Sequence, residues 1–188
     1  DVDRKGKGFF AQSVSDRFPL VPCEDEGRLH NFEIRESWLT AVFTLARFRV
    51  VSKSGKYADL VRFHSEHKYL FMSLNQAMMK SMGKVVANHE GLVIGDVFSL
   101  YGKMLSGILC KPARVGNRIN TLQHMYGYFS GKVSKNEREY FIDSMEEYRR
   151  GGTPFCTMLK LIKGLALRFE EKYLLSQYIL SPYPEKLF

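Results

Sequence analysis

Apolar residues recur every three or four positions along most of the chain, which places them on one side of an α-helix. A clear example is the stripe formed by Trp38, Val42, Leu45 and Phe48. No segment sustains the alternation of apolar and polar residues that a half-buried strand requires. The pattern therefore predicts an all-α protein, a single helical domain of about seven helices with an extended N-terminal strap.

Capping residues and helix breakers set the expected boundaries. Asn31 is an expected N-cap, and Ser134 with Glu137 has the spacing of a capping box. Glycine and proline residues between the apolar stripes end the segments. The expected helices cover residues 32–51, 56–71, 73–87, 94–109, 114–130, 135–149 and 154–180.

Residues 1–34 differ from the rest and form the strap, whereas residues 35–188 form the helical domain. Pro19 and Pro22 are expected to hold the strap extended. Four of its side chains are too apolar to remain in water, so we expect the strap to pack against the domain. These side chains are Phe9, Phe10, Phe18 and Leu20.

The net charge of the chain is +8, and it is unevenly distributed. Residues 111–133 contain four basic residues and no acidic residue, the densest positive segment of the chain. Such a field favours polyanionic partners, nucleic acid first; a basic domain without such a partner is the alternative. No apolar run approaches the length of a bilayer span, so no membrane partner is expected.

The three cysteines, Cys23, Cys110 and Cys156, are far apart in the sequence and form no C-x-x-C pair. This pattern indicates reduced thiols that behave as small buried hydrophobic groups in a cytoplasmic protein. The chain begins with Asp1, which is typical of a processed product, a trimmed piece or a fragment of something longer.

Residues 114–129 form the segment in which we expect binding. Asn120 and His124 lie one helical turn apart, on a side that the apolar residues do not use. Against nucleic acid, basic groups would neutralise phosphates, amide and imidazole groups would make directed hydrogen bonds, and an aromatic ring would stack on a base. The candidates are Arg114, Arg118, Lys132, Lys163 and Lys68 for phosphates, Asn120, Gln123 and His124 for hydrogen bonds, and Tyr128 for stacking. The alternative is a structural network in which Asn120 and His124 bond to a neighbouring helix.

His64 and His67 form an H-x-x-H pair on one side of a helix. No third ligand is indicated nearby, so no metal site is assigned. A buried, hydrogen-bonded pair and direct contact with an anionic ligand are the two interpretations. His124 is a candidate general base, but no nucleophile is spaced to suit it. The residues define no reaction, and whether the chain is an enzyme is left open.

Several motifs resemble the YbgA-type bacterial domain of unknown function. They are N-R-I-N-T-L-Q-H-M-Y-G-Y-F, E-Y-R-R-G-G-T-P-F and Y-L-L-S-Q-Y-I-L-S-P-Y-P-E-K-L, with F-H-S-E-H-K and M-G-K-V-V-A in the first half. The resemblance covers residues 36–188 and does not reveal an activity.

The preceding segment, G-K-G-F-F-A-Q-S-V-S-D-R-F-P-L-V-P-C-E-D-E-G-R-L, resembles the end of an iron–sulfur domain that often precedes YbgA-type domains. That domain is similar to bacterial thiouracil desulfidases, which use a [4Fe–4S] cluster on three cysteines. The resemblance implies that those cysteines lie upstream of Asp1. Cys23 stands where relatives have an aliphatic residue, so no cluster ligand and no cofactor are assigned to this chain.

Three hypotheses follow. The first is an accessory domain that binds RNA, such as tRNA, and serves a pyrimidine (thiouracil) desulfidase-type domain in cis or in trans. The second is a small-ligand or catalytic pocket built on His64, His67, Asn120 and His124. The third is a structural module that docks on the desulfidase-type domain and completes its fold.

Overall fold

The computed structural model describes residues 8–18 and 21–187, and it confirms the all-α fold, because no strand occurs in those ranges. The α-helices are α1 (Phe9–Arg17), α2 (Phe32–Ser54), α3 (Tyr57–Glu66), α4 (Lys68–Leu74), α5 (Gln76–Ala87), α6 (Ile94–Leu109), α7 (Val115–Tyr126), α8 (Lys135–Arg149), α9 (Phe155–Arg168) and α10 (Lys172–Leu175). Short 3-10 helices are η1 (Arg28–His30), η2 (Gly127–Phe129), η3 (Tyr178–Leu180) and η4 (Glu185–Leu187).

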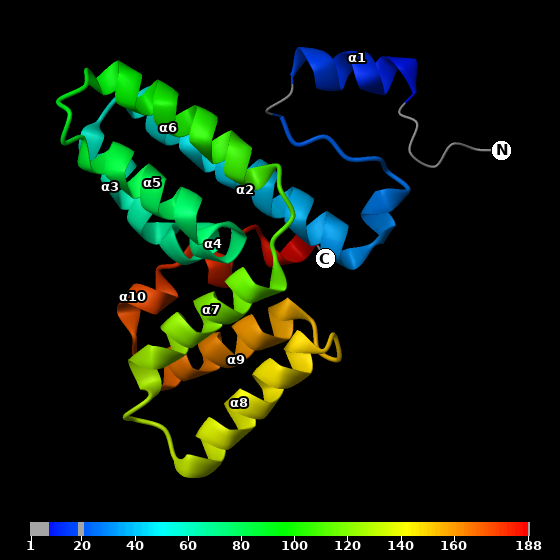
Figure 1. Cartoon of the computed structure of the whole chain (residues 1–188), viewed down its shortest axis with the longest axis vertical. Coiled ribbons are helices and arrows are strands. Elements are labelled where there is room, and N and C mark those ends of the chain that lie inside the picture. The colour runs from blue at the N-terminus through cyan, green and yellow to red at the C-terminus, as the bar shows by residue number, and fades with distance from the viewer. Residues whose placement is uncertain (1–7, 19–20, 188) are drawn as a thin grey trace.

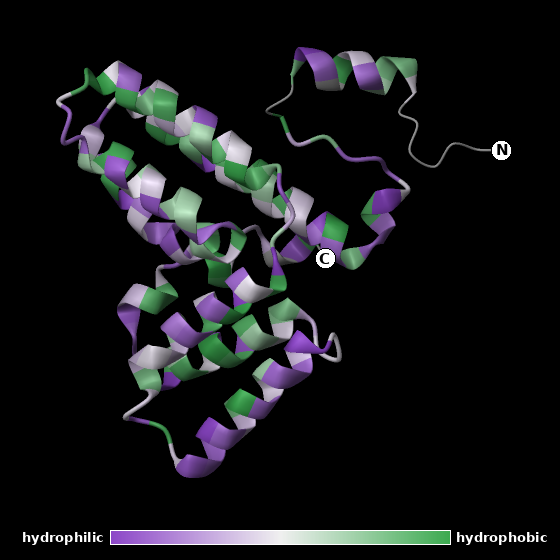
Figure 2. Cartoon of the chain, in the orientation of Figure 1, coloured by the Kyte–Doolittle hydropathy of each residue, from purple (hydrophilic) through white to green (hydrophobic). Residues whose placement is uncertain are grey.

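The helices form two groups that meet at α4 (Figure 1). In the upper group, α2 and α3 pack together, and α6 contacts both α2 and α5. The lower group consists of α7, α8 and α9, and α8 lies at its edge, where hydrophilic residues dominate its surface (Figure 2). Because α4 contacts both α5 and α7, it joins the two groups into one body.

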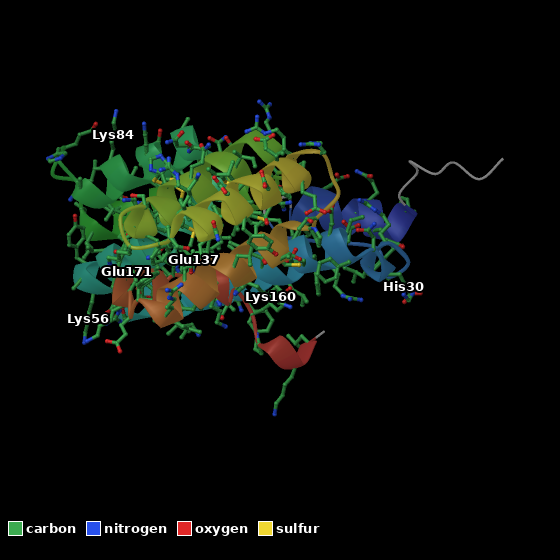
Figure 3. The ribbon with its side chains drawn as sticks, turned by 90° about the horizontal axis from the view of Figure 1, so that it is seen from below. His30, Lys56, Lys84, Glu137, Lys160 and Glu171 are labelled. Carbon is green, nitrogen blue, oxygen red and sulfur yellow. The ribbon has the colours of Figure 1, made fainter. Side chains whose placement is uncertain are left out.

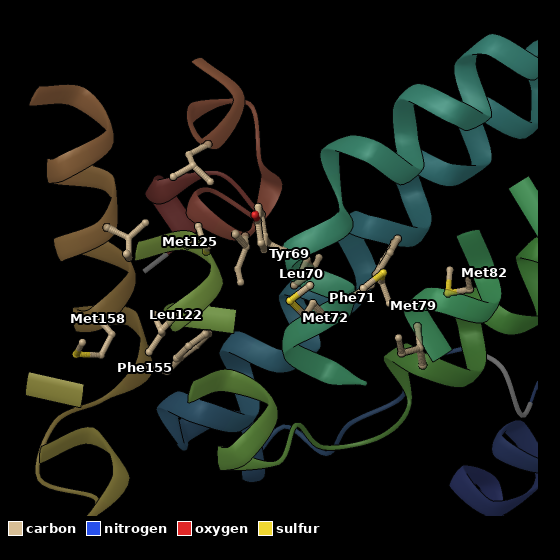
Figure 4. Close-up of a cluster of buried hydrophobic side chains, with 14 of the residues drawn as sticks. Tyr69, Leu70, Phe71, Met72, Met79, Met82, Leu122, Met125, Phe155 and Met158 are labelled. Carbon is tan, nitrogen blue, oxygen red and sulfur yellow. The ribbon is translucent and has the colours of Figure 1, made fainter. Parts of the chain in front are cut away.

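A single hydrophobic core runs through both groups. Tyr69, Leu70, Phe71 and Met72 of α4 lie at its middle (Figure 4). Methionines fill it on both sides: Met79 and Met82 in the upper group, Met125 and Met158 in the lower group. These unbranched side chains adapt to irregular gaps, which suits a core that must connect two helix groups.

The two caps predicted at Asn31 and Ser134 are confirmed. The Asn31 side chain accepts a hydrogen bond from the Ile34 amide at 3.1 Å and begins α2. Ser134 and Glu137 form a complete capping box at the start of α8. Each cap satisfies a backbone N–H group that has no partner inside the helix.

Three predicted helices were wrong in extent. The segments 56–71 and 73–87 form three helices, because the backbone leaves helical geometry at His67 and at Asn75. Asn75 is extended, and its side chain accepts from the Met78 amide at 3.0 Å, which starts a new helix. The predicted helix 154–180 ends at Arg168, because Glu170 takes a left-handed conformation with φ of 52°.

The expectation that the strap packs through its phenylalanines was also wrong. Phe9 is 91% exposed and Phe10 is 80% exposed, and α1 stands away from the helical body (Figure 1). Pro19 and Leu20 lie outside the described residues. The part of the strap that does contact the domain is anchored at Trp38, whose Nε1 donates to the Pro22 carbonyl at 3.1 Å. Apolar composition alone therefore did not predict burial, because it does not supply a surface to pack against.

Candidate functional site

The most open polar surface in the predicted binding segment is one face of α7. We call it the α7 strip: Gly116, Asn120, Gln123, His124 and Gly127. Their spacing places them on one side of the helix, and all are exposed except Asn120, which is half-buried. Apart from the adjacent residues and the helix's own backbone, no described atom lies within 4 Å of the position where a Cβ of Gly116 or Gly127 would stand. The strip therefore presents backbone, amide and imidazole groups on a surface without bulky side chains.

Three exposed cations flank the α7 strip. Lys111 and Arg114 precede α7, and Lys132 follows η2. None of the ion pairs found among the described residues involves these three side chains. The Lys132 ammonium group lies 5.9 Å from the centre of the Phe169 ring. The positive charge that the sequence predicts here is thus exposed and not neutralised within that part of the chain.

Arg118 differs from its neighbours because it turns into the protein. Its guanidinium carbon lies 4.7 Å from the centre of the Phe155 ring. Its Nε is buried and has no hydrogen-bond partner among the described residues. Burial raises the pKa of the nearby Glu36 carboxyl, and the positive charge of Arg118 partly offsets that rise. Arg118 therefore belongs to the space between α2, α7 and α9, and not to the α7 strip.

Two asparagines of α7 behave differently. Asn117, which the sequence analysis did not select, donates its Nδ2 to the Leu74 carbonyl at 2.8 Å and ties α7 to the end of α4. Asn120 was predicted to form hydrogen bonds with nucleic acid. Its Nδ2 is buried without a hydrogen-bond partner in the described part of the chain. The Asn120 amide nitrogen is thus closed off from the surface that the exposed members of the α7 strip share.

The remaining nucleic-acid candidates do not lie on one surface. Tyr128 is 37% exposed and follows directly after the strip, and the Tyr69 hydroxyl donates to its hydroxyl at 3.4 Å. Lys163 on α9 is half-buried, with Nζ 3.4 Å from the Ser181 hydroxyl. Lys68 is at the start of α4, with Nζ 5.9 Å from the centre of the Tyr69 ring. Only Tyr128 of these three continues the α7 strip.

His67 is fully buried in a network that leaves both ring nitrogens occupied. Its ring stacks on those of Phe63 and Tyr178, with centroid distances of 4.0 and 4.4 Å. Nε2 accepts from Arg47 Nε at 3.1 Å, so the proton is on Nδ1, which donates to the Phe63 carbonyl at 2.7 Å. Burial lowers the pKa of His67 to about 3. The ring is therefore neutral near pH 7 and has a structural role.

His64 is half-buried next to the same core. Its Nδ1 lies 3.0 Å from the Tyr101 hydroxyl on α6. Burial, and secondarily the charge of Lys68, lowers its pKa to about 4. The ring is held against α6, and His64 lines none of the pockets around α2, α7 and α9.

Arg47 is the residue of this network that sequence reasoning missed. Its guanidinium group donates to the Pro182 carbonyl at 2.8 Å and to the Thr44 hydroxyl at 3.2 Å, and lies 4.0 Å from the centre of the Tyr178 ring. It thereby joins α2, the α3–α4 junction and the C-terminal segment. One signal was available: Arg47 is the one charged residue in the segment A-V-F-T-L-A-R-F.

Three pockets lie around α2, α7 and α9. The first, of about 510 Å³, is between the strap, α2 and the loop after α6, and is lined by Cys23, Cys110, Arg118 and other residues. The second, of about 420 Å³, is between α9 and the C-terminal segment. A smaller space of about 60 Å³ contains Arg118 and Glu36. Cys23 and Cys110 are exposed, which corrects the expectation of buried thiols. The Cys110 thiol is still partly desolvated, and this raises its pKa.

The residues of the predicted catalytic pocket are not brought together in these spaces. None of the three pockets is lined by His64, His67, Asn120 or His124. Among the described residues, no group of three or more His, Cys, Asp or Glu side chains is placed to hold a metal ion. No helix in the described ranges is long and apolar enough to cross a membrane.

These features define an all-helical domain with one polar, acid-free helix face and an inward-turned arginine beside it. Comparison with known proteins identifies the family. The chain belongs to the family described as "Protein of unknown function (DUF1722)", which matches residues 68–184.

A relative of this chain is "Uncharacterized protein YbgA" of Escherichia coli (strain K12). It is 26% identical over 151 residues, which cover 79% of this chain and 89% of that protein. No solved structure matches the chain. The YbgA-like resemblance is thus confirmed, and the family match includes the α7 strip. The desulfidase-like resemblance of the strap stays a prediction, because the strap precedes the family match.

Proposed function

We propose that this domain binds RNA, with tRNA as the first candidate, through the α7 strip. The observation that supports the proposal most directly is the exposure of an acid-free helix face with exposed cations at both of its ends. Phosphate groups dominate the affinity of such contacts, and exposed amide and imidazole groups add directed hydrogen bonds.

Each group has a defined role in the proposed complex. Arg114 and Lys132 neutralise phosphates at the two ends of the strip, while Gln123 and His124 bond to base edges or to ribose hydroxyls. Tyr128 offers the exposed part of its ring for stacking. Arg118 and Lys163 line pockets instead, so a polymer meets Arg114 and Lys132 first.

The test is a fluorescence anisotropy titration with tRNA, single-stranded RNA and duplex DNA at about 50 and 200 mM salt. We expect RNA affinity to fall steeply with salt. Arg114→Ala with Lys132→Ala should reduce the slope of log K against log salt by about 1.4. The matched control removes two exposed lysines of the upper helix group, Lys53→Ala with Lys84→Ala, and should bind as the unmodified chain does.

A second pair of variants separates charge from hydrogen bonding. Gln123→Ala with His124→Ala should weaken RNA binding without changing the salt slope, because neither substitution removes a lysine or an arginine. Absence of binding at micromolar protein in low salt would overturn the proposal. An equal effect of the Lys53 and Lys84 control would also overturn it, because the binding would then be non-specific attraction to a basic protein.

A second candidate function is docking on a desulfidase-type domain, in cis or in trans, and the exposed phenylalanines of the strap favour it. Phe9, Phe10 and Phe18 are 91%, 80% and 52% exposed, an apolar surface of the kind that marks a protein contact. Any [4Fe–4S] cluster in this arrangement belongs to the partner. Co-purification with a separately expressed thiouracil desulfidase-type domain tests it. We expect the pair to co-elute and Phe9→Ser with Phe10→Ser to separate it; elution of unmodified partners as separate species would refute it.

A further inference from the structure

The second pocket, between α9 and the C-terminal segment, has features of a small-ligand site. One wall is a single face of α9, where Cys156, Leu159, Lys160 and Lys163 follow helical spacing. The opposite wall is residues 179–183. Its volume of about 420 Å³ falls in the range of small-molecule sites. We call this space the C-terminal cleft.

The two parts of the C-terminal cleft differ in polarity. Leu159, Ile179 and Leu180 provide apolar lining. Lys160 is exposed, and Figure 3 shows it on the underside of the body near the point where the C-terminal segment leaves. Lys163 is half-buried beside the Ser181 hydroxyl. An apolar lining with a few cationic and hydroxyl groups at one side is typical of sites for amphiphilic anions.

The C-terminal cleft continues toward α7. Glu36, Leu159, Ile179 and Pro182 line both the cleft and the smaller space that contains Arg118. The buried Arg118 Nε has no hydrogen-bond partner within the described residues. Arg118 lines that smaller space and not the cleft itself, so its guanidinium group adds positive charge behind the shared wall.

We propose that the C-terminal cleft binds a small amphiphilic anion, a phosphate or carboxylate attached to an aromatic or aliphatic body. The anionic group lies between Lys160, Lys163 and the Ser181 hydroxyl. The apolar body lies against Leu159 and Leu180, where it leaves water. This site is separate from the α7 strip and does not rest on RNA binding.

The first experiment compares four probes by isothermal titration calorimetry with the whole chain: phenyl phosphate, phenylacetate, inorganic phosphate and benzyl alcohol. We expect the best amphiphilic anion to bind at least about tenfold more tightly than either inorganic phosphate or benzyl alcohol, because only it uses both parts of the cleft. The phosphate and carboxylate probes identify which anionic group the cleft prefers. Equal affinities for all four probes, or no binding at about 10 mM, would overturn the proposal.

Lysine variants locate the site. Lys160→Met with Lys163→Met keeps the length of both side chains and removes their charge, and should weaken phenyl phosphate about tenfold or more. Lys103→Met on α6 is the matched control, because it removes an exposed lysine of another surface. We expect the control to bind as the unmodified chain does, and a similar loss in both variants would refute the placement.

The cysteines provide a second, independent measurement. Cys156 lines the C-terminal cleft, whereas Cys23 and Cys110 line the pocket next to the strap. Saturating phenyl phosphate should slow the reaction of Cys156 with N-ethylmaleimide several-fold, followed by mass spectrometry, and should leave the other two rates unchanged. Unchanged labelling of Cys156 would exclude binding in the cleft.

A competition titration separates this proposal from RNA binding. Phenyl phosphate should not displace RNA, because the cleft and the α7 strip are lined by different residues. If phenyl phosphate displaces RNA from the unmodified chain but not from Lys160→Met with Lys163→Met, the two ligands share one site. That result would overturn the proposal of a separate cleft. If RNA does not bind at all, the calorimetry and labelling still decide the cleft proposal.

Discussion

Acid should destabilise this protein through His67. The perturbation is a decrease in pH from 7 to 5, which charges histidines in the unfolded chain. In the folded chain the ring is fully buried, its Nε2 already accepts from Arg47, and its pKa is lowered by burial to about 3. Protonation would remove that acceptor and place a cation against the guanidinium group.

The size of the effect follows from the two pKa values. Because the folded pKa is below the unfolded value of 6.5, stability from His67 is fully present above pH 6.5 and is lost as the pH falls toward about 3. Each pH unit in that window costs about 1.4 kcal/mol of unfolding free energy. Between pH 7 and pH 5, His67 should therefore cost about 2 kcal/mol.

The assay is urea unfolding followed by circular dichroism at pH 7, 6 and 5, with His67→Gln as the comparison. At pH 7 the variant should be less stable, because it loses the ring stack. Between pH 7 and pH 5 its free energy of unfolding should fall by about 2 kcal/mol less than that of the unmodified chain. His64 and the carboxylates are present in both chains, so their contributions cancel. The control is His124→Gln, which removes an exposed histidine outside this network. Parallel curves for His67→Gln and the unmodified chain would refute this account of His67.

Three further predictions concern stability. Arg47→Met should lower the free energy of unfolding by about 2–4 kcal/mol, because it leaves buried acceptors unpaired. Arg49→Met on the exposed side is the control and should change it by less than about 0.5 kcal/mol. Equal effects of the two variants in denaturant titrations would contradict the network. Ser134→Ala should cost about 1 kcal/mol by the same measurement, since it removes the N-cap of α8, and an unchanged midpoint would argue against the cap. Phe9→Ser with Phe10→Ser should change unfolding by less than about 0.5 kcal/mol, and a larger loss would mean that α1 packs on the domain.

Local sequence signals were sufficient for the fold class and for several helix starts. Helical spacing of apolar residues and the caps at Asn31 and Ser134 act within one or two turns, so they can be recognised without knowing the neighbours. The same signals did not predict the break between α3 and α4 at His67, which belongs to a network with Arg47 and Pro182. Those partners lie 20 and 115 residues away, and no local pattern contains them.

The candidate site was predictable only in part. Periodicity correctly placed His124 away from the apolar side of α7, whereas Asn120, predicted on the same side, is half-buried. Composition identified the acid-free segment around them. The sequence pattern gave no reason to distinguish Arg114 from Arg118 as donors. The structure separates them, because Phe155 of α9 and Glu36 of α2 surround Arg118 while Arg114 remains in water.

The sequence by itself thus determined the all-α class, most helix positions and the polar face of α7, because these depend on periodicity and capping within a few residues. Only the tertiary structure decided which polar groups became buried and which stayed exposed. It placed His67 and Arg47 in the interior, directed Lys163 into the C-terminal cleft, and left Phe9 in water. Burial depends on which surfaces meet after the chain folds, and those surfaces come from segments far apart in the sequence.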